Sequence, residues 1–412
     1  MKLLQINTTV NSGSTGRIAE GIGRVAISAG HSGFIAAAYT NRPSENEVIP
    51  IGDALDLKLH GVKSRLLDRH GFGSSGATIE LITKIEKLRP DIIHLHNLHG
   101  YYLHIGQLFN YLKTANTPVV WTLHDCWSFT GHCCFFDSVN CDKWKTQCGK
   151  CPLYNKYPKS LFVDNSANNY QHKRAIFNGV KNLTLVTPSY WLQHHVSNSF
   201  LNKYPVKVIH NGIDTQKFIP LAKDSLLLKQ ELNIPDKNII LGVASIWDKR
   251  KGLADFIKLS EIIADTEIIV LVGLTKEIIK TLPGNIIGIE RTESVEELVA
   301  IYSLAMVFIN PTWVDNFPTT NIEALSCGTP VITYNTGGSI EAVDEKTGFI
   351  VAKGNVTALK TAIDTIKSKA KSSYIDACRN RALLYFNDHE RFADYLSLYE
   401  MVLQQQSTPV HS

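Results

Sequence analysis

Short apolar runs alternate with segments of helical period along most of the chain. The runs that read as buried strands cover residues 2–7, 33–39, 91–96, 118–123 and 183–188, and then 238–245, 267–273, 286–289, 306–311, 330–334 and 349–351. Strands that are apolar on both faces and alternate with helices are typical of parallel sheets covered on both sides. The pattern therefore predicts an α/β fold built from doubly wound parallel sheets.

The alternation is interrupted near residues 211–224, a polar stretch that contains proline and has no strong period. We interpret this stretch as a linker between two domains. The expected boundaries are an N-terminal domain over 1–215, a second domain over 216–385 and a C-terminal helix over 386–412 that packs back on the first domain. In open α/β sheets, ligands bind beyond the carboxyl ends of the strands, so the loops that follow the strands are the places to look for chemistry.

Composition and charge exclude several classes of protein. The 412 residues are 44% hydrophobic and 19% charged with a net charge of +4, which is ordinary for a soluble globular protein and too mild to indicate a nucleic-acid partner. The N-terminal apolar run is shorter than that of a signal peptide, and no run reaches the ~18 residues of a membrane span. We expect a cytoplasmic protein with reduced thiols, and a local basic patch leaves peripheral contact with the inner face of the membrane open.

The loop after the first strand leads into a helix that the period places from about residue 15. Its glycines permit close approach of the backbone to a ligand, and a helix N-terminus favours an anion. An ordinary strand-to-helix turn is the alternative. The candidate binding residues are Gly13, Ser14, Thr15, Gly16 and Arg17.

Histidines gather after the third and fourth strands. His94, His96, His99 and His104 could suggest a metal, but no nearby carboxylate completes a ligand set, so buried or cleft-lining polar groups are favoured. His124 and Asp125 follow an apolar strand directly, where a histidine can hydrogen-bond a substrate hydroxyl or carbonyl.

Three adjacent cations, Lys249, Arg250 and Lys251, follow the first strand of the second domain and precede Gly252. They suit a diphosphate, because Arg binds such oxygens bidentately and Lys acts as a point charge. A solvated run of charge is the alternative interpretation.

The segment 311–338 is the strongest local signal. Asp315 lies eight positions before Glu323, and the intervening Pro318, Thr319 and Thr320 predict the start of a helix. The N–H groups at that start would face a phosphate. Glu323, about one turn into the helix, could accept hydrogen bonds from two ribose hydroxyls. An ordinary capped helix with a surface glutamate is the alternative.

Taken together and in this order, these motifs resemble the retaining enzymes of glycosyltransferase family 4. The resemblance spans nearly the whole chain and also includes TPSYWL (187–192), VIHNGID (208–214) and EALSCGTPVI (323–332). It implies the GT-B fold, in which two Rossmann-like domains face each other across a cleft. The first domain would bind the acceptor and the second the nucleotide-sugar.

The resemblance also implies residue roles. Glu323 would hold the ribose, Asp315 the sugar hydroxyls, and Thr319 and Thr320 the diphosphate. Lys251 matches the family's phosphate-binding lysine, and His124 matches a histidine close to the reacting centre. Residues 13–17 would border the phosphates and the acceptor, and residues 289–305 would shape the base pocket.

The chain departs from the family pattern at two positions. Asp315 stands where the family has a glutamate, and Ile246 lies near the position of the family arginine. We expect Arg250, or else Lys249, to supply the second cation.

The reaction implied is retaining transfer, without a catalytic metal, from a UDP- or GDP-sugar to a saccharide or lipid-linked saccharide in bacterial surface polysaccharide synthesis. The alternative is a catalytically inactive GT-B scaffold within a polysaccharide assembly complex. Phosphorolysis or epimerisation on the same fold is a further alternative, and no pyridoxal phosphate lysine signature supports a phosphorylase.

Six of the eight cysteines lie within residues 126–151, in a segment (126–160) that reads as an insertion. A similar cysteine pattern occurs in the subset of family 4 enzymes linked to exopolysaccharide or lipopolysaccharide assembly. The last pair has C-x-x-C spacing, and four thiolates suit a closed structural zinc site. The candidate ligands are Cys133, Cys141, Cys148 and Cys151, with Cys134 or His132 as replacements for Cys133. Unliganded thiols, a disulfide or a redox role are the alternatives. We expect the insertion to lack a core of its own, so that a metal would organise it.

Overall fold

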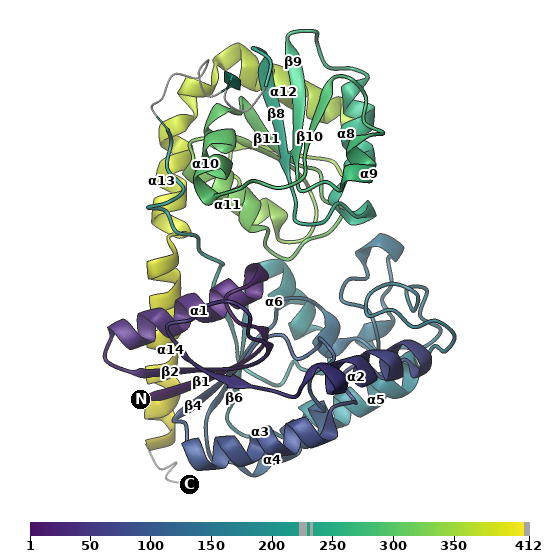
Figure 1. Cartoon of the computed structure of the whole chain (residues 1–412), viewed down its shortest axis with the longest axis vertical. Coiled ribbons are helices and arrows are strands. Elements are labelled where there is room, and N and C mark those ends of the chain that lie inside the picture. The colour runs from purple at the N-terminus through teal and green to yellow at the C-terminus, as the bar shows by residue number, and fades with distance from the viewer. Residues whose placement is uncertain (222–228, 231–233, 408–412) are drawn as a thin grey trace. The chain divides into compact units, whose positions relative to one another are not determined.

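The computed structural model describes residues 1–221, 229–230 and 234–407, and the chain divides into two compact units (Figure 1). Unit 1 comprises Met1–His210 together with Phe392–Ser412, and unit 2 comprises Asn211–Arg391. The expected boundaries lay at 215/216 and 385/386, whereas the division of the structure falls at 210/211 and 391/392. The end of the expected linker, residues 222–224, lies outside the described residues.

Unit 1 is built on a seven-stranded sheet in the order β3-β2-β1-β4-β5-β6-β7, in which every neighbouring pair is parallel. Its strands are β1 (Lys2–Thr9), β2 (Ser32–Tyr39), β3 (Glu47–Pro50), β4 (Ile92–Leu95), β5 (Val119–Thr122), β6 (Leu183–Thr187) and β7 (Val206–Val208). Its helices are α1 (Gly13–Ser28), α2 (Ala54–Leu67), α3 (Ser75–Leu88), α4 (Ile105–Thr114), α5 (Ser166–Phe177), α6 (Tyr190–Ser197) and α14 (Asp388–Ser407). Three 3-10 turns, η1 (Trp127–Phe129), η2 (Asp137–Val139) and η3 (Lys143–Lys145), lie between β5 and α5.

Unit 2 is built on a six-stranded parallel sheet in the order β10-β9-β8-β11-β12-β13. Its strands are β8 (Asn238–Val243), β9 (Glu267–Val272), β10 (Ile286–Ile289), β11 (Val307–Asn310), β12 (Val331–Tyr334) and β13 (Gly348–Val351). Its helices are α8 (Leu253–Ser260), α9 (Lys276–Ile279), α10 (Val295–Leu304), α11 (Thr319–Ser326), α12 (Val356–Lys369) and α13 (Ile375–Tyr385). The 3-10 turns are η4 (Lys249–Lys251), η5 (Ser339–Ala342) and η6 (Lys371–Ser373).

Every apolar run predicted as a strand forms one, and the two parallel sheets confirm the predicted α/β class. The strands β3 and β7, at the two edges of the unit 1 sheet, were not predicted. None of the helices that the structure describes is long and apolar enough to span a lipid bilayer.

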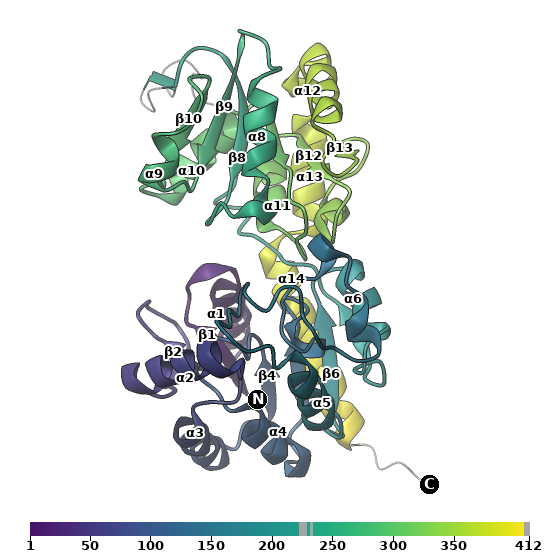
Figure 2. The ribbon, with the colours of Figure 1, turned by 90° about the vertical axis from the view of Figure 1, so that its right-hand side faces the viewer.

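The C-terminal helix α14 belongs mainly to the N-terminal unit, where it lies along one face of the sheet together with α1 (Figure 2). Its buried side chains recur at helical spacing and pack on Leu3, Ile92, Val120 and Val186 of the strands; they are Phe392, Tyr395, Leu398, Tyr399 and Val402. Tyr399 also makes a 2.6 Å hydrogen bond between its hydroxyl and Nδ1 of His94, which anchors the helix to β4.

Candidate active site

The turn after β8 presents the predicted cations in a fixed geometry. Asp248 caps η4, because its Oδ1 accepts hydrogen bonds from the backbone N–H of Arg250 (3.0 Å) and of Lys251 (3.1 Å). Gly252 then takes a left-handed φ of +78°, and a Cβ there would lie 2.3 Å from the carbonyl oxygen of Pro311. The sequence thus turns sharply after three cations and brings the turn against the loop that follows β11.

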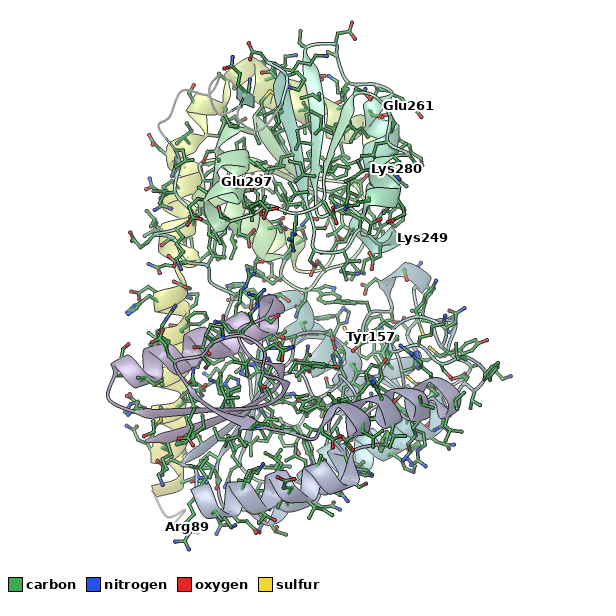
Figure 3. The ribbon with its side chains drawn as sticks, viewed as in Figure 1. Arg89, Tyr157, Lys249, Glu261, Lys280 and Glu297 are labelled. Atoms are coloured by element: carbon green, nitrogen blue, oxygen red, sulfur yellow. The ribbon has the colours of Figure 1, made fainter. Side chains whose placement is uncertain are left out.

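Arg250 and Lys251 converge on Asp315 in that loop. Lys251 Nζ lies 2.5 Å from Asp315 Oδ2, and Arg250 Nη1 lies 3.5 Å from the same oxygen while donating to the carbonyl oxygen of Val314 at 3.0 Å. Burial by itself raises the pKa of Asp315, but the charges of Lys251 and Arg250 outweigh it, so the pKa is lowered and the carboxylate stays ionised. Lys249, labelled in Figure 3, is exposed and Arg250 is not.

Helix α11 begins at Thr319, as the sequence predicted, with Pro318 as the residue before its first turn and no side-chain cap. Its N-terminal N–H groups are therefore not engaged by a capping side chain. Glu323, one turn further on, accepts a 2.9 Å hydrogen bond from the hydroxyl of Tyr302 on α10. Tyr302 is fully buried, which raises the pKa of its hydroxyl, so it remains a proton donor to the carboxylate.

A pocket of about 430 Å³ opens at the carboxyl ends of β8, β9 and β10. Its lining combines backbone, small polar side chains and two side chains from residues 289–305, the region that the family resemblance assigns to the base. The lining residues are Ser245, Gly273, Leu274, Thr275, Lys276, Glu277, Glu290 and Arg291.

In unit 1, the glycine turn after β1 leads directly into α1, which begins at Gly13. Gly13 has a φ of +65°, and a Cβ on Gly16 would lie 2.7 Å from Oγ1 of Thr9. Ser12 precedes the helix but its side chain forms no cap. Ser14, Thr15 and Arg17 are the side chains that this first turn presents, and Arg17 is exposed.

His124 ends a chain of hydrogen bonds that starts in β1. Gln5 donates from Nε2 to the carbonyl oxygen of Ala19 (2.7 Å), and its Oε1 lies 3.0 Å from His96 Nε2. His96 Nδ1 lies 3.2 Å from His124 Nε2. Burial lowers the pKa of His96 far below its usual value and that of His124 to about 4, so both rings are neutral at pH 7. His96 then donates to Gln5, accepts from His124, and leaves Nδ1 of His124 as the acceptor nitrogen.

The other predicted histidines are held by protein groups. His94 is buried between Tyr399 and Thr122, and His99 is hydrogen-bonded to Asp125 (2.8 Å) and to the hydroxyl of Tyr157, which is labelled in Figure 3 (3.1 Å). Both are buried polar groups, as interpreted, but the expectation that no carboxylate lies near the histidines is wrong for His99, which contacts Asp125.

The structure brings together Arg250, Lys251 and Asp315, and it places Thr319, Thr320 and Glu323 on one helix. His124 and residues 13–17 belong to unit 1. The four predicted zinc ligands line one small cavity. The sequence reasoning missed Asp248, Tyr302, Gln5 and His96 as partners of these groups, although a glutamine within the apolar strand 2–7 was a usable signal.

Comparison with known proteins adds independent information. The model described as Glycosyltransferase Family 4 matches residues 16–217, and the model described as Glycosyl transferases group 1 matches residues 237–368. The chain belongs to glycosyltransferase family 4. This family 4 glycosyltransferase is 26% identical over 376 residues to the colanic acid biosynthesis glycosyl transferase WcaC of Escherichia coli, a match that covers 87% of this chain and 89% of that protein.

Solved structures confirm the GT-B fold of this family 4 enzyme. Sucrose-phosphate synthase from Thermosynechococcus elongatus superposes with a TM-score of 0.72 at 17% identity, covering 98% of this chain and 99% of that one. HepE from Anabaena, solved in complex with UDP, superposes with a TM-score of 0.67 at 14% identity, covering 97% and 100%.

Proposed function

We propose that this glycosyltransferase moves a sugar from a UDP- or GDP-sugar to a saccharide or lipid-linked saccharide acceptor in the synthesis of a bacterial surface polysaccharide. The observation that carries the proposal is the pair of cations, Arg250 and Lys251, held on Asp315 in unit 2. The name of the Escherichia coli relative supports a polysaccharide product, and the UDP bound by HepE supports a uridine nucleotide.

The pair of cations supplies what the leaving group needs. When the bond between the sugar C1 and the phosphate oxygen breaks, negative charge develops on the nucleoside diphosphate, and preorganised positive charge stabilises it. Lys251 and Arg250 provide that charge, and the first turn of α11 with Thr319 and Thr320 adds backbone N–H groups. Asp315 keeps both cations ordered before the donor arrives and can then accept a hydrogen bond from a sugar hydroxyl. We propose that these groups, rather than a divalent metal, neutralise the diphosphate.

Retention follows from a front-face route in which no side chain becomes a nucleophile. The acceptor hydroxyl oxygen forms the new bond to C1 on the face that the phosphate leaves, and its proton passes to the departing phosphate oxygen. The family resemblance assigns His124 to a donor sugar hydroxyl, and its neutral ring suits a hydrogen bond to a hydroxyl better than a role as an acid at pH 7.

The inactive-scaffold alternative rested on the departures at Asp315 and Ile246. Ile246 is 72% exposed, and the cation absent there is supplied four residues later by Arg250, which reaches Asp315. Asp315 keeps an ionised carboxylate between two cations. Both observations favour an active enzyme.

The test is release of nucleoside diphosphate by the purified chain from UDP-, GDP- and ADP-sugars, with thermal stabilisation measured in parallel, with and without EDTA. We expect one nucleotide class to stabilise the protein and to be released slowly in the absence of acceptor, unaffected by EDTA. The anomeric configuration of the transferred sugar, read by NMR, tests retention. If the folded protein neither binds nor turns over any donor, with or without acceptor, the scaffold alternative is supported. Loss of activity in EDTA would overturn the metal-independent mechanism.

We further propose that unit 1 docks on an anionic membrane surface through helix α2. The buried side of this helix carries polar side chains, His60 and Ser64, whereas its exposed side carries a stripe of apolar side chains. The stripe, with side chains 42% to 64% exposed, consists of Leu55, Leu59, Val62 and Leu66. Their spacing of four, three and four residues places them on one face.

A second apolar segment adjoins the stripe. Leu161, Phe162 and Val163 are all exposed, Phe162 by 77%, and the backbone N–H of Leu161 donates to the carbonyl oxygen of Arg65 at 2.7 Å. Cations surround both segments, namely Lys58, Lys63, Arg65, Lys156 and Lys159, while Asp53 and Asp56 lie at the start of the helix. An apolar face ringed by cations is typical of helices that lie in the membrane interface, where a lipid-linked acceptor would be met.

The membrane proposal is tested by co-sedimentation with phosphatidylcholine vesicles and with vesicles that also contain phosphatidylglycerol. We expect binding to the anionic vesicles, weakened about tenfold or more by Leu59→Glu combined with Phe162→Glu, since each side chain contributes roughly 1.5–3 kcal/mol when buried. Leu384→Glu, a change at a 70% exposed leucine of unit 2, is the matched control and should have no effect. Equal binding by the wild type and the double variant, or a wild-type dimer that the double variant dissociates in the absence of lipid, would overturn it.

A further inference from the structure

The cysteine-rich insertion, residues 126–160, is stabilised unevenly along its length. Phe136 stacks on Trp144 with ring centroids 4.9 Å apart, and Phe129 packs against the same indole at 5.3 Å. These rings belong to the same buried cluster as the strands of unit 1, so the first half of the insertion packs into the unit 1 core and, as expected, has no core of its own. From residue 146 to 160 the described backbone contains turns but no helix or strand, and this second half holds Cys148 and Cys151.

Four thiols from the two halves meet at one cavity. Cys133, Cys141, Cys148 and Cys151 all line a cavity of about 20 Å³, and Phe136 and Trp144 are among the other residues that line it. That volume exceeds the ~10–15 Å³ that a single water-sized sphere requires. Among the described residues no three of these four sulfur atoms lie within 4.8 Å of one another, whereas a tetrahedral zinc site with Zn–S near 2.3 Å needs S···S of about 3.8 Å. The sulfurs would have to turn inward on binding.

The surroundings of the cavity suit sulfur that carries negative charge. The backbone N–H of Gly131 points at Cys148 Sγ at 3.2 Å, and a Cβ on Gly131 would lie 2.1 Å from the carbonyl oxygen of Ser166. Such N–H donation to sulfur is a contact that supports metal-bound thiolates.

A buried cation interacts with one of these four thiols, Cys148. Lys173 is 1% exposed, and its Nζ donates to the carbonyl oxygens of Trp127 (2.8 Å) and Thr130 (3.1 Å). In the part of the chain that the structure describes, no carboxylate oxygen lies within 4.0 Å of this ammonium, and the groups around it that can carry opposite charge are Cys134, Cys148, Asp68 and Asp125. A buried cation is costly unless an anion compensates it, and a zinc ion with four thiolates carries a net charge of −2.

The neighbouring candidates fit a metal less well. His132 uses both ring nitrogens, Nδ1 with Asp68 at 2.6 Å and Nε2 with the carbonyl oxygen of Lys156 at 3.3 Å. Cys134 faces away from the cavity and lies with His99 and Asp125, where three potential ligand atoms fall within 4.8 Å of one another. In that trio His99 and Asp125 already share a 2.8 Å hydrogen bond, and Asp125 also accepts the N–H of Trp127.

We propose that Cys133, Cys141, Cys148 and Cys151 bind one Zn²⁺ in a closed tetrahedral site that joins the two halves of the insertion. Four protein ligands leave no open position, so the ion has a structural role and takes no part in sugar transfer. Gly131 and Lys173 support the bound thiolates.

The test measures metal directly. The full chain, purified with reductant and no added metal, should contain about one zinc per chain by plasma mass spectrometry. Cys148→Ser and Cys141→Ser should each lose the zinc and lower the thermal midpoint, while Cys378→Ser, a change at a buried thiol of unit 2, should retain it. Because the serine variants could fail to fold, Co²⁺ is also exchanged into the wild type. Intense thiolate-to-cobalt charge transfer and tetrahedral ligand-field bands are expected, together with protection of these four thiols from alkylation.

Three results would overturn the proposal. One is a reduced, folded chain that remains free of zinc after incubation with micromolar Zn²⁺. Another is a Cys133–Cys151 disulfide in protein whose thiols were trapped at lysis. The third is zinc that is lost in Cys134→Ser but retained in Cys148→Ser, which would assign the ion to His99, Asp125 and Cys134.

Discussion

Asp315 has one methylene fewer than the glutamate of the family pattern. In this structure the side chains of Arg250 and Lys251 reach its carboxylate. Asp248 fixes the turn so that Arg250 and Lys251 project toward the carboxylate while Lys249 remains in solvent. The sequence could place three cations after β8 but could not select among them. The selection depends on the cap formed by Asp248 and on the close approach at Gly252.

Replacement of Lys251 tests this selection. Lys251→Met keeps the aliphatic stem but removes the charge, so the leaving diphosphate loses one of its two cations. We expect kcat/KM for the donor to fall about 100-fold or more, in line with the loss of a preorganised electrostatic contact. The matched change Lys249→Met should stay within about threefold of wild type, because that side chain is exposed. Equal losses in the two variants would refute the assignment.

Buried polar partners were the residues least accessible to sequence reasoning. Gln5 interrupts an apolar strand and could have been flagged, because a buried amide must find partners. Tyr302 could not, since it lies 21 positions before Glu323 on another helix and reads as part of an apolar helical face. Only the packing of α10 beside α11 brings its hydroxyl to the carboxylate.

At the scale of elements, that hydrogen bond couples α10 to Glu323, the proposed ribose-binding residue of α11. Tyr302→Phe removes the hydroxyl and keeps the ring, so Glu323 loses its donor. We expect weaker binding of the nucleoside diphosphate by a factor of about five to ten, with kcat little changed, since a hydrogen bond to a charged group is worth roughly 1.5 kcal/mol.

Calorimetric titration of the nucleotide, with donor kinetics in parallel, provides the measurement. Tyr374→Phe is the control, because its buried hydroxyl has no hydrogen-bond partner among the residues that the structure describes. A fall in kcat without a change in affinity would show that Tyr302 acts on the chemical step instead.

The neutral imidazole of His60 anchors helix α2 to the loop that contains Gly71 and Gly73. His60 Nε2 accepts from the N–H groups of Gly71 (3.3 Å) and Gly73 (3.2 Å), and burial, with a smaller contribution from Lys63, lowers its pKa to about 4. The unfolded chain takes up a proton here as the pH falls through about 6.5, and the folded chain does so only near 4. This residue therefore decreases the free energy of unfolding as the pH is lowered from 7 to 5, by about 2 kcal/mol.

The pH effect is measured by urea unfolding at pH 7 and pH 5. His60→Gln should lose less stability between these two pH values than wild type, by about that amount. His389→Gln, a change at an exposed histidine, should show the wild-type dependence. An unchanged pH dependence in the His60 variant would contradict the neutral anchor.

The elements that escaped prediction share a physical reason. β3 and β7 are four and three residues long, lie at the two edges of the sheet and pair with one neighbour only. Their residues are half exposed, so no continuous apolar run marks them. The central strands, buried on both faces, carry that signal in their composition, and this is why the fold could be predicted while its edges could not.

At the scale of the whole molecule, helix α14 comes from the C-terminal end of the chain but packs into the core of unit 1, which the N-terminal residues build. Tyr399 is fully buried, and its hydroxyl satisfies His94. Tyr399→Ala should reduce the stability of unit 1 by about 3 kcal/mol or more, through a cavity and an unpaired imidazole nitrogen.

Hydrogen exchange read separately on peptides of β4 and β11 provides the measurement. We expect faster exchange in β4 and no change in β11. Tyr385→Ala, a change at a half-exposed tyrosine of unit 2, should leave β4 protected. Equal acceleration in both strands would mean that the units unfold together.

The membership of α14 in unit 1 also sets an order of events during synthesis. A ribosome releases the first 210 residues long before residues 392–402 exist, so the part of the face made by Leu3, Ile92, Val120 and Val186 that α14 covers stays exposed while all of unit 2 is translated. Unit 2 is contiguous in the chain and can fold as soon as it emerges. Unit 1 is thus synthesised first but can complete its fold only last. A nascent chain stalled before Phe392 would expose an apolar surface to which chaperones bind.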